Sequence, residues 1–394
     1  MIHAPSDLLP ALIALRRTLH AEAEVGLVLP RTQQRIVEAL DGLGLEISTG
    51  RQLTSVTAVL RGGEPGPVVL LRADMDALPV VETTRLPFAS PDVAMHACGH
   101  DLHMAGLVGA ARLLAARREE LAGTVVFMFQ PGEEGYAGGR MMLDEGVLDA
   151  AGERPVAAYA VHVDCTTAGG TAVTRAGAIM ASASGMRIRV TGTGGHAAWP
   201  EHAVDPMPVA AEIVLAIQSF VARRIPVSDP AVVSVTRISS DSAAGNVLSA
   251  TVDMEANVRS LSRETLQLMR TELPRLVTAI GEAHGCVVDA EFIDSYPVTV
   301  NDPGETDEVF ALLDEVYGPA NVVRLPHPSM ASEDFAYVLE EIPGTLLFLG
   351  VRPAETPAAR APGMHSATAV FDDGRLDTHA VVLAELAWRR LLRA

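Results

Sequence analysis

Acidic and histidine side chains follow three short apolar stretches of the sequence. The stretches at 67–74, 124–130 and 156–163 indicate buried strands with helical segments between them. In open α/β sheets, ligands collect beyond the carboxyl ends of the strands. We therefore expect one site to be built from the residues at these ends, which are Asp74, Asp76, Glu133, Glu134 and His162.

A segment just ahead of a predicted helix adds sulfur and imidazole donors. Cys98 and His100 flank Gly99, and a glycine lets the backbone turn tightly so that both side chains can face one point. Thiolate, imidazole and carboxylate together suit zinc, manganese, cobalt or nickel, whereas magnesium and calcium prefer oxygen ligands. Taken singly, each residue has a commoner structural interpretation, such as a buried apolar cysteine or a core histidine. Their combination with the strand-end residues favours a metal site.

The composition limits the classes of function. The formal net charge is −19 over 394 residues, so the chain lacks the basic surface that nucleic acid or an anionic membrane attracts. The three cysteines make no disulfide framework and fit a reducing compartment. Residues 8–19 mix apolar side chains with arginines as an amphipathic helix does, and no apolar stretch approaches the length of a membrane span. We expect a soluble, cytoplasmic protein without nucleic-acid or membrane partners.

The order of predicted elements changes at about residue 184. Before it, and again after about residue 297, strands alternate with helices, as in an α/β sheet with crossover helices. Between these points the order is β-α-β-β-α-β, which resembles a small ferredoxin-like sandwich. We therefore predict an α/β domain of residues 1–183 and 298–394, with an inserted α+β domain of residues 184–297.

Five segments, in order along nearly the whole chain, carry a family resemblance. They are Arg72-Ala-Asp-Met-Asp-Ala-Leu-Pro79, Met95-His-Ala-Cys-Gly-His-Asp101, Phe129-Gln-Pro-Gly-Glu-Glu-Gly135, Gly192-Thr-Gly-Gly-His196 and Ser332-Glu-Asp-Phe335. They resemble the M20 peptidase family, and within it the aminoacylase branch of hippurate hydrolases, N-acyl-amino-acid amidohydrolases and auxin-conjugate hydrolases. The resemblance implies a zinc-peptidase-like catalytic domain with a mixed central sheet flanked by helices. It also implies that the inserted domain is a lid that commonly carries the dimer contact.

The resemblance further implies roles for individual side chains. Two divalent metal ions would be held by Cys98, His100, Glu134, His162 and His365. Glu133 would be the general base and acid, and Asp76 would orient a ligand. His196 of the lid would stabilise the oxyanion, in its own subunit or across a homodimer or higher homo-oligomer. Asn246 and Arg259 would hold the free carboxylate of the substrate.

The leading hypothesis is metal-dependent hydrolysis of an N-acyl-L-amino acid to a carboxylic acid and a free amino acid. A bound divalent cation lowers the pKa of water toward about 7, and Glu133 can take a proton from that water and deliver it to the leaving nitrogen. A dipeptidase, aminopeptidase-like or carboxypeptidase-like exopeptidase of the same family is the alternative, although Arg259 and Asn246 favour a free carboxylate over a free amine. A catalytically silent metal-binding carrier or scaffold would not need a base at Glu133.

Overall fold

The computed structural model describes residues 1–393, which divide into two compact units. The first unit comprises Met1–Ile179, Val300–His327 and the chain from Asp334 onward. The second unit comprises Met180–Thr299 and Pro328–Glu333. Two short strands, β7 (Gly177–Met180) and β14 (Thr299–Asn301), lie where the chain passes from one unit to the other. The functions expected of the two predicted domains stay predictions.

An eight-stranded mixed sheet forms the centre of the first unit, as expected. β3 runs parallel to β4 and β5, and β16 runs parallel to β5, whereas β2 is antiparallel to β1 and β4. Across the sheet the strands follow the order β1 (Glu46–Thr49), β2 (Val56–Arg61), β4 (Ala122–Gln130), β3 (Glu64–Asp74), β5 (Ala157–Ala168), β16 (Gly344–Arg352), β6 (Ala172–Thr174) and β15 (Val322–Arg324). The three strands predicted to carry the site, β3, β4 and β5, are therefore parallel neighbours in its middle.

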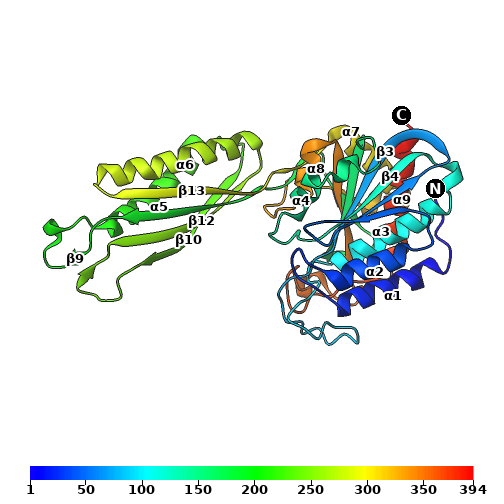
Figure 1. Ribbon diagram of the computed structural model, residues 1–394, viewed down its shortest axis with the longest axis horizontal. Coiled ribbons are helices and arrows are strands. Elements are labelled where there is room, and N and C mark those ends of the chain that lie inside the picture. The colour runs from blue at the N-terminus through cyan, green and yellow to red at the C-terminus, as the bar shows by residue number, and fades with distance from the viewer. Residues whose placement is uncertain (394) are drawn as a thin grey trace. The chain divides into compact units, whose positions relative to one another are not determined.

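Helices cover both faces of this sheet. One face carries the main apolar core and is covered by α1 (Leu8–Ala21), α2 (Pro30–Leu40), α3 (His100–Ala115), α7 (Pro303–Tyr317) and α9 (Leu376–Leu391). The short helices α4 (Gly138–Asp144) and α8 (Ala336–Glu341) pack against each other, and α4 also contacts β4. Figure 1 shows α1, α2 and α3 gathered on one side of the sheet. This layered arrangement leaves the carboxyl ends of the central strands for the site.

The Ala- and Leu-rich segment 104–120 predicts a helix, and the observed helix begins earlier. α3 starts at His100, and the chain up to Ala115 is almost entirely buried, because the helix lies against the sheet. Gly99 precedes the helix with φ +83°, the left-handed conformation that glycine adopts without strain. A short 3₁₀ turn, Arg118–Glu120, takes the place of the predicted last turn. His100 therefore stands in the first turn of a rigid helix.

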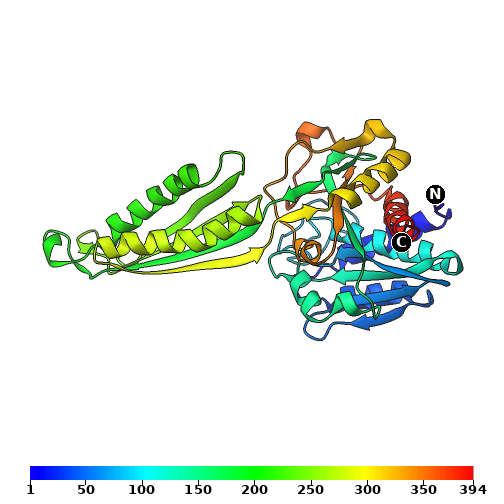
Figure 2. The ribbon, with the colours of Figure 1, turned by 90° about the horizontal axis from the view of Figure 1, so that it is seen from above.

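The second unit has the predicted ferredoxin-like order. β8 (Ala183–Thr191), α5 (Pro206–Arg224), β10 (Ala231–Ser240), β12 (Thr251–Ser260), α6 (Arg263–Ala283) and β13 (Val287–Tyr296) follow one another along the chain. The strands form an antiparallel sheet in the order β10-β12-β8-β13, and α5 and α6 pack on one face of it (Figure 2). A small ribbon, β9 (Gly195–His196) with β11 (Val247–Leu248), extends this unit. The predicted fold class is confirmed.

Helix α5 is long and apolar enough, by length and composition alone, to cross a membrane. Among the described residues it is the one helix that meets these criteria, and a third of the apolar stretch is buried. Its buried residues, which include Val209, Ile213 and Ile217, face the core of the second unit. Its apolar character is therefore accounted for in part by packing against its own sheet.

Candidate metal centre

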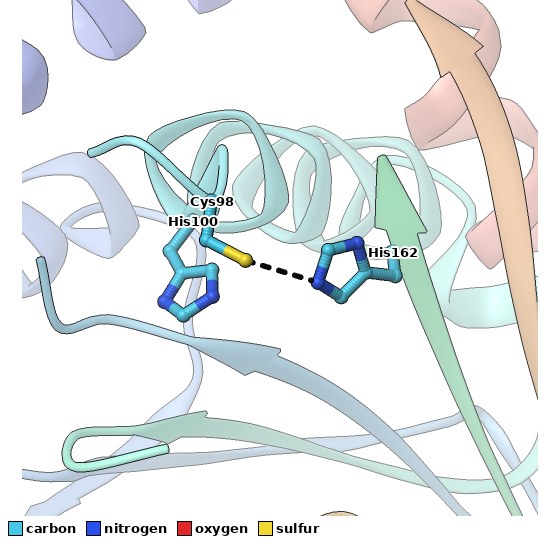
Figure 3. A group of neighbouring side chains, drawn as sticks. All are labelled: Cys98, His100 and His162. Carbon is cyan, nitrogen blue, oxygen red and sulfur yellow. Dashed lines mark hydrogen bonds between the residues drawn. The ribbon is translucent and has the colours of Figure 1, made fainter. Parts of the chain in front are cut away.

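The predicted ligands come together from four places in the first unit. Cys98 and His100 lie at the start of α3, His162 in β5, Glu134 after β4, and His365 ahead of α9. Their donor atoms form two groups of three, each within 4.8 Å: Cys98, His100 and His162 in one, and Cys98, Glu134 and His365 in the other. Cys98 belongs to both groups, so its sulfur stands between them. Figure 3 shows the first group, with the His162 ring pointing toward the Cys98 sulfur.

The backbone at Gly99 turns Cys98 and His100 toward the same point. A Cβ atom at Gly99 would come within 2.4 Å of a Val163 methyl carbon and 2.9 Å of the Phe371 ring, so the position admits no side chain. His100 Nδ1 lies 2.7 Å from the backbone oxygen of Asp76. Because a carbonyl oxygen only accepts, Nδ1 carries a proton, and in the neutral ring Nε2 keeps its lone pair. His100 Nε2 is buried and has no hydrogen-bond partner among residues 1–393, which fits a nitrogen prepared for a metal ion.

Asp76 holds the glutamate pair through its carboxylate. Its Oδ1 accepts the Glu133 N–H at 2.9 Å and its Oδ2 accepts the Glu134 N–H at 3.0 Å. Asp76 is also fully buried, as is most of Glu133, whereas Glu134 is partly exposed. The Asp76 carboxylate thus positions the backbone N–H groups of Glu133 and Glu134. Its backbone carbonyl oxygen positions the ring of His100. This is a more detailed form of the orienting role that the resemblance implied, and the role itself stays a prediction.

The two remaining histidines are oriented by backbone groups. His162 Nδ1 lies 2.7 Å from the Val163 carbonyl oxygen, so its Nε2 faces the Cys98 sulfur at 3.5 Å. His365 has φ +67°, and its N–H donates to the Ala97 carbonyl at 2.9 Å. Its Nε2 lies 3.2 Å from Glu134 Oε1. A non-glycine residue in the left-handed region is uncommon and is found at sites where the surroundings impose it.

The charges of the site favour a bound cation. Burial raises the pKa of the Cys98 thiol, but the neighbouring imidazoles, His162 foremost, outweigh it and bring the pKa to about 6. Hydrogen bonds to Cys98 and Glu134 raise the pKa of His365 to about 10. The site therefore gathers negative sulfur and carboxylate groups, which protonated imidazoles balance. A divalent ion can replace these protons, and the mixed sulfur, nitrogen and oxygen donors suit zinc or a similar ion.

His196 and Asn246 lie together in the ribbon of the second unit. The Ala197 N–H donates to the Asn246 carbonyl at 3.0 Å, next to the pairing of β9 with β11. His196 Nδ1 accepts the Ala198 N–H at 3.1 Å, so a neutral His196 carries its proton on Nε2. The exposed Trp199 ring packs against the imidazole at a tilt of 41°, with ring centroids 4.6 Å apart. His196 therefore presents an N–H donor on an ordered ring.

Arg259 lies outside that ribbon, on β12. Its Nε donates to Asn257 Oδ1 at 3.0 Å, and its Nη1 is buried without a hydrogen-bond partner in the described part of the chain. Burial lowers the pKa of Arg259. A half-buried guanidinium with an unused donor is suited to binding a carboxylate.

Four buried residues lie next to the ligands. The sequence predicts Asp74 as part of the site and His103 as a structural or ligand-supporting residue, whereas it predicts no role for Arg72 and Asp334. His103, Asp74, Arg72 and Asp334 form a connected series of hydrogen bonds and ion pairs. All four stand within or next to the motif segments, but Arg72 and Asp334 are 262 residues apart in the chain. Only the fold brings them together.

The donor set and its place at the carboxyl ends of parallel strands are those of a metal-binding site on an α/β fold. The sequence profile described as "Peptidase family M20/M25/M40" matches residues 70–389. The chain therefore belongs to this peptidase family, as its motifs predicted.

Several known proteins are similar to this chain in sequence or structure over nearly its full length. The chain is 35% identical over 381 residues to "Thermostable carboxypeptidase 1" of Saccharolobus solfataricus. The alignment covers 95% of this chain and 94% of the relative. It is 36% identical over 381 residues to "N-acetylcysteine deacetylase" of Bacillus subtilis, and this alignment covers 95% of this chain and 96% of the relative. The solved structure titled as the Bacillus subtilis YXEP protein, "a Dinuclear Metal Binding Peptidase from M20 Family", has a TM-score of 0.85 at 32% identity and covers 99% of this chain and 100% of that chain. These findings support a hydrolase that binds divalent metal ions.

Proposed function

We propose that this protein hydrolyses the amide bond of N-acyl-L-amino acids at a binuclear metal centre. The observation that carries the proposal is the pair of donor groups that share Cys98, with the Glu133–Glu134 pair beside them. His100, Glu133 and Glu134 also form a group within 4.8 Å of one another. Zinc, manganese, cobalt and nickel all suit these donors.

Cys98, His100, Glu134, His162 and His365 would hold the metal ions. When bound, divalent ions supply a Lewis acid and lower the pKa of water. The Glu133 carboxylate takes a proton from the attacking water as the bond between oxygen and the acyl carbon forms. It then delivers that proton to the amide nitrogen as the carbon–nitrogen bond breaks. Because the Asp76 carboxylate holds the Glu133 backbone, the base is fixed in position.

The His196 Nε2–H would donate to the oxygen that gains negative charge during the attack. A donor aimed at this charge in the transition state lowers the barrier more than it strengthens substrate binding. The Ala198 N–H, which donates to Nδ1, favours the tautomer that this role needs, and the tilted Trp199 ring packs beside the imidazole.

The proposed substrate class agrees with the names of two relatives. An N-acetylcysteine deacetylase and a carboxypeptidase both act on compounds whose leaving amino acid ends in a free carboxylate. The carboxypeptidase name is also the reason to keep peptide hydrolysis as the second candidate.

A substrate panel separates these candidates. Purified, metal-analysed protein is offered acetyl-, benzoyl- and long-chain acyl-amino acids, together with dipeptides that have a free amine and acyl-dipeptides. We expect release of the free amino acid from the acyl-amino acids. Activity on the peptides alone would replace the proposal by the exopeptidase alternative, and no activity on any of them with metal present would favour the silent carrier.

Replacing Arg259 by glutamine should raise KM for substrates with a free carboxylate by about 10- to 100-fold, the loss of a charge-assisted hydrogen bond. The matched esterified substrates should lose much less, because they lack the charge that the guanidinium binds. Steady-state kinetics on both substrate forms measure the difference.

Arg187 is the control for this substitution. It lies on β8 of the same sheet, with an exposed side chain whose guanidinium is 3.7 Å from Glu291. Arg187→Gln should leave KM unchanged. Equal losses on acid and ester substrates in the Arg259 variant would contradict a carboxylate-binding role.

We also propose a homodimer formed through the second unit. β10 is an edge strand, with Val232 and Ile238 exposed, and α5 exposes Met207 and Leu215, the latter to 72%. Exposed apolar side chains beside an open strand edge are a common basis for pairing between chains.

Light scattering tests this pairing. Wild-type protein should show twice the mass of the chain, and Leu215→Glu should show the mass of one chain. Val287→Glu, at an equally exposed position on the opposite edge strand β13, should remain dimeric. A monomeric wild type, or a dimer that survives Leu215→Glu, would refute the proposed interface.

A cytoplasmic location is proposed as well, because Cys98, Cys165 and Cys286 are all unpaired and reduced cysteines are typical of that compartment. Cell fractionation that recovers the protein with secreted or periplasmic markers would contradict it.

A further inference from the structure

His103 connects the helix that carries two ligands to the strand that carries a third. It is buried in α3, three residues after His100. Its Nε2 lies 2.8 Å from the backbone N–H of Val163 in β5, and its Nδ1 lies 2.5 Å from Asp74 Oδ1. Because a backbone N–H only donates, Nε2 is the acceptor and Nδ1 carries the proton that Asp74 accepts. Both ring nitrogens are thus used, and the tautomer is fixed.

Val163 is the residue that orients His162. Its N–H is held by His103, and its carbonyl oxygen accepts from His162 Nδ1 at 2.7 Å. The His103 ring is also close to the His162 ring, with centroids 4.6 Å apart. A displacement of His103 would therefore move both the backbone and the ring of His162 relative to Cys98.

Asp74 is held on its other side by a buried series of ion pairs. Its Oδ2 accepts from Arg72 Nη1 at 2.7 Å, and Arg72 Nη2 donates to Asp334 Oδ1 at 2.9 Å. Gln130 Nε2 lies 2.7 and 2.8 Å from the two Asp334 oxygens. Arg72, Asp74 and Asp334 are each at most 2% exposed. The carboxylate that holds His103 is therefore rigid, and the series gives the Asp334 segment a role that its motif alone did not suggest.

Asp74, His100 and His103 also meet the distance criterion for a metal group of their own. Two observations oppose that interpretation. The Arg72 guanidinium contacts Asp74 and would repel a cation there. Moreover, His103 has no free nitrogen, since its lone pair is taken by the Val163 N–H.

We propose that His103 is a positioning residue, which sets the place of His162 relative to Cys98 and His100 without binding the metal itself. This inference rests on the proposed function, because it assumes that these three residues are ligands. Residues that hold metal ligands in place typically change metal affinity by about 10- to 100-fold when they are replaced.

Two substitutions separate the effects of the two hydrogen bonds that His103 makes, one with Val163 and one with Asp74. His103→Asn keeps an amide donor near the Nδ1 position, which can still reach Asp74, but removes the acceptor for Val163. His103→Gln keeps an oxygen acceptor near the Nε2 position and removes the donor to Asp74. We expect the asparagine variant to lose about 10- to 100-fold in affinity for Zn²⁺, and the glutamine variant to lose less.

His379 provides the matched control. It is buried in α9, its ring centroid lies 6.4 Å from that of His103, and its Nε2 has no hydrogen-bond partner among the residues that the structure describes. His379→Gln disturbs the same layer of the core, and the structure shows no hydrogen bond from the His379 side chain to Val163 or Asp74. It should leave the Zn²⁺ affinity unchanged.

The test is competition between the full-length protein and a chelator for Zn²⁺, with the absorption spectrum of bound Co²⁺ as a second readout. A weakened affinity and an altered thiolate–cobalt spectrum in His103→Asn, with both unchanged in His379→Gln, support the proposal. Wild-type affinity in both His103 variants overturns it, and so do equal losses in the His103 and His379 variants, which would indicate general disruption of the core. If His103→Asn does not fold, His103→Gln is compared with His379→Gln, and the smaller loss of Zn²⁺ affinity expected of it must still exceed that of the His379 variant.

The failure of this inference is distinct from a failure of the proposed function. Metal binding is measured without substrate, so an inactive wild type that binds Zn²⁺ would leave the His103 result interpretable. A wild type that binds no metal would overturn the proposed function and this inference together.

Discussion

Replacement of Glu133 by alanine is expected to abolish amide hydrolysis while the metal ions stay bound. Glu133 lies beside Glu134, but the group of donors around Cys98 and His365 includes only Glu134. Without the carboxylate, no side chain in the proposed mechanism takes the proton from water, and general acid–base catalysis of this kind contributes about 10²- to 10⁴-fold. Turnover and metal content, measured on the same preparation, give the result.

The neighbouring glutamate is the matched control. Glu134→Ala removes a proposed ligand from the same turn, and it should lose metal and activity together. Glu133→Gln keeps the shape and polarity of the side chain without its basicity, and it should be as inactive as the alanine variant. Unchanged turnover in Glu133→Ala, or loss of metal from it, would contradict the division of roles between the two residues.

Replacement of His196 by alanine is expected to lower kcat by about 10²- to 10³-fold, the usual loss when one oxyanion donor is removed. KM should change little, because the Nε2–H would bind charge that exists only in the transition state. Steady-state kinetics on one acyl-amino acid measure both quantities.

His202 is the control for this experiment. It follows His196 by six residues in the same unit, and its side chain is 77% exposed. His202→Ala should leave both kinetic parameters unchanged. A rise in KM at constant kcat in the His196 variant would assign His196 to ground-state binding instead.

Much of the fold could be predicted from the periodicity of the sequence. In β8, Met186, Ile188 and Val190 are buried while Arg187 and Arg189 are exposed, and this alternation is visible directly in the residue types. The same periodicity predicts that α3 begins at Met104, whereas the helix begins at His100. His100 and Asp101 are polar residues that resemble a loop, and their burial depends on partners far away in the chain.

Site residues that are positioned by nearby backbone features could be predicted from the sequence, whereas those positioned by distant segments could not. Cys98, His100 and His162 follow from the glycine turn and the strand end, both of which are local features. His365 is identified by family resemblance alone. It lies in a loop and has a left-handed backbone conformation that no local sequence pattern predicts. The hydrogen bonds and ion pairs that connect His103, Asp74, Arg72 and Asp334 could not be predicted. They depend on the register of β3 and β4 and on a segment 262 residues from Arg72.

The most direct test of the account is a metal titration of the stripped protein with hydrolysis of an acyl-amino acid followed at each step. The two donor groups that share Cys98 predict that activity is absent without metal and rises to a plateau as two divalent ions bind per chain. Proton release should accompany binding, because the ions replace protons on the ligands. Activity that survives complete metal removal, or full metal loading without hydrolysis of any acyl-amino acid, would contradict the central claim.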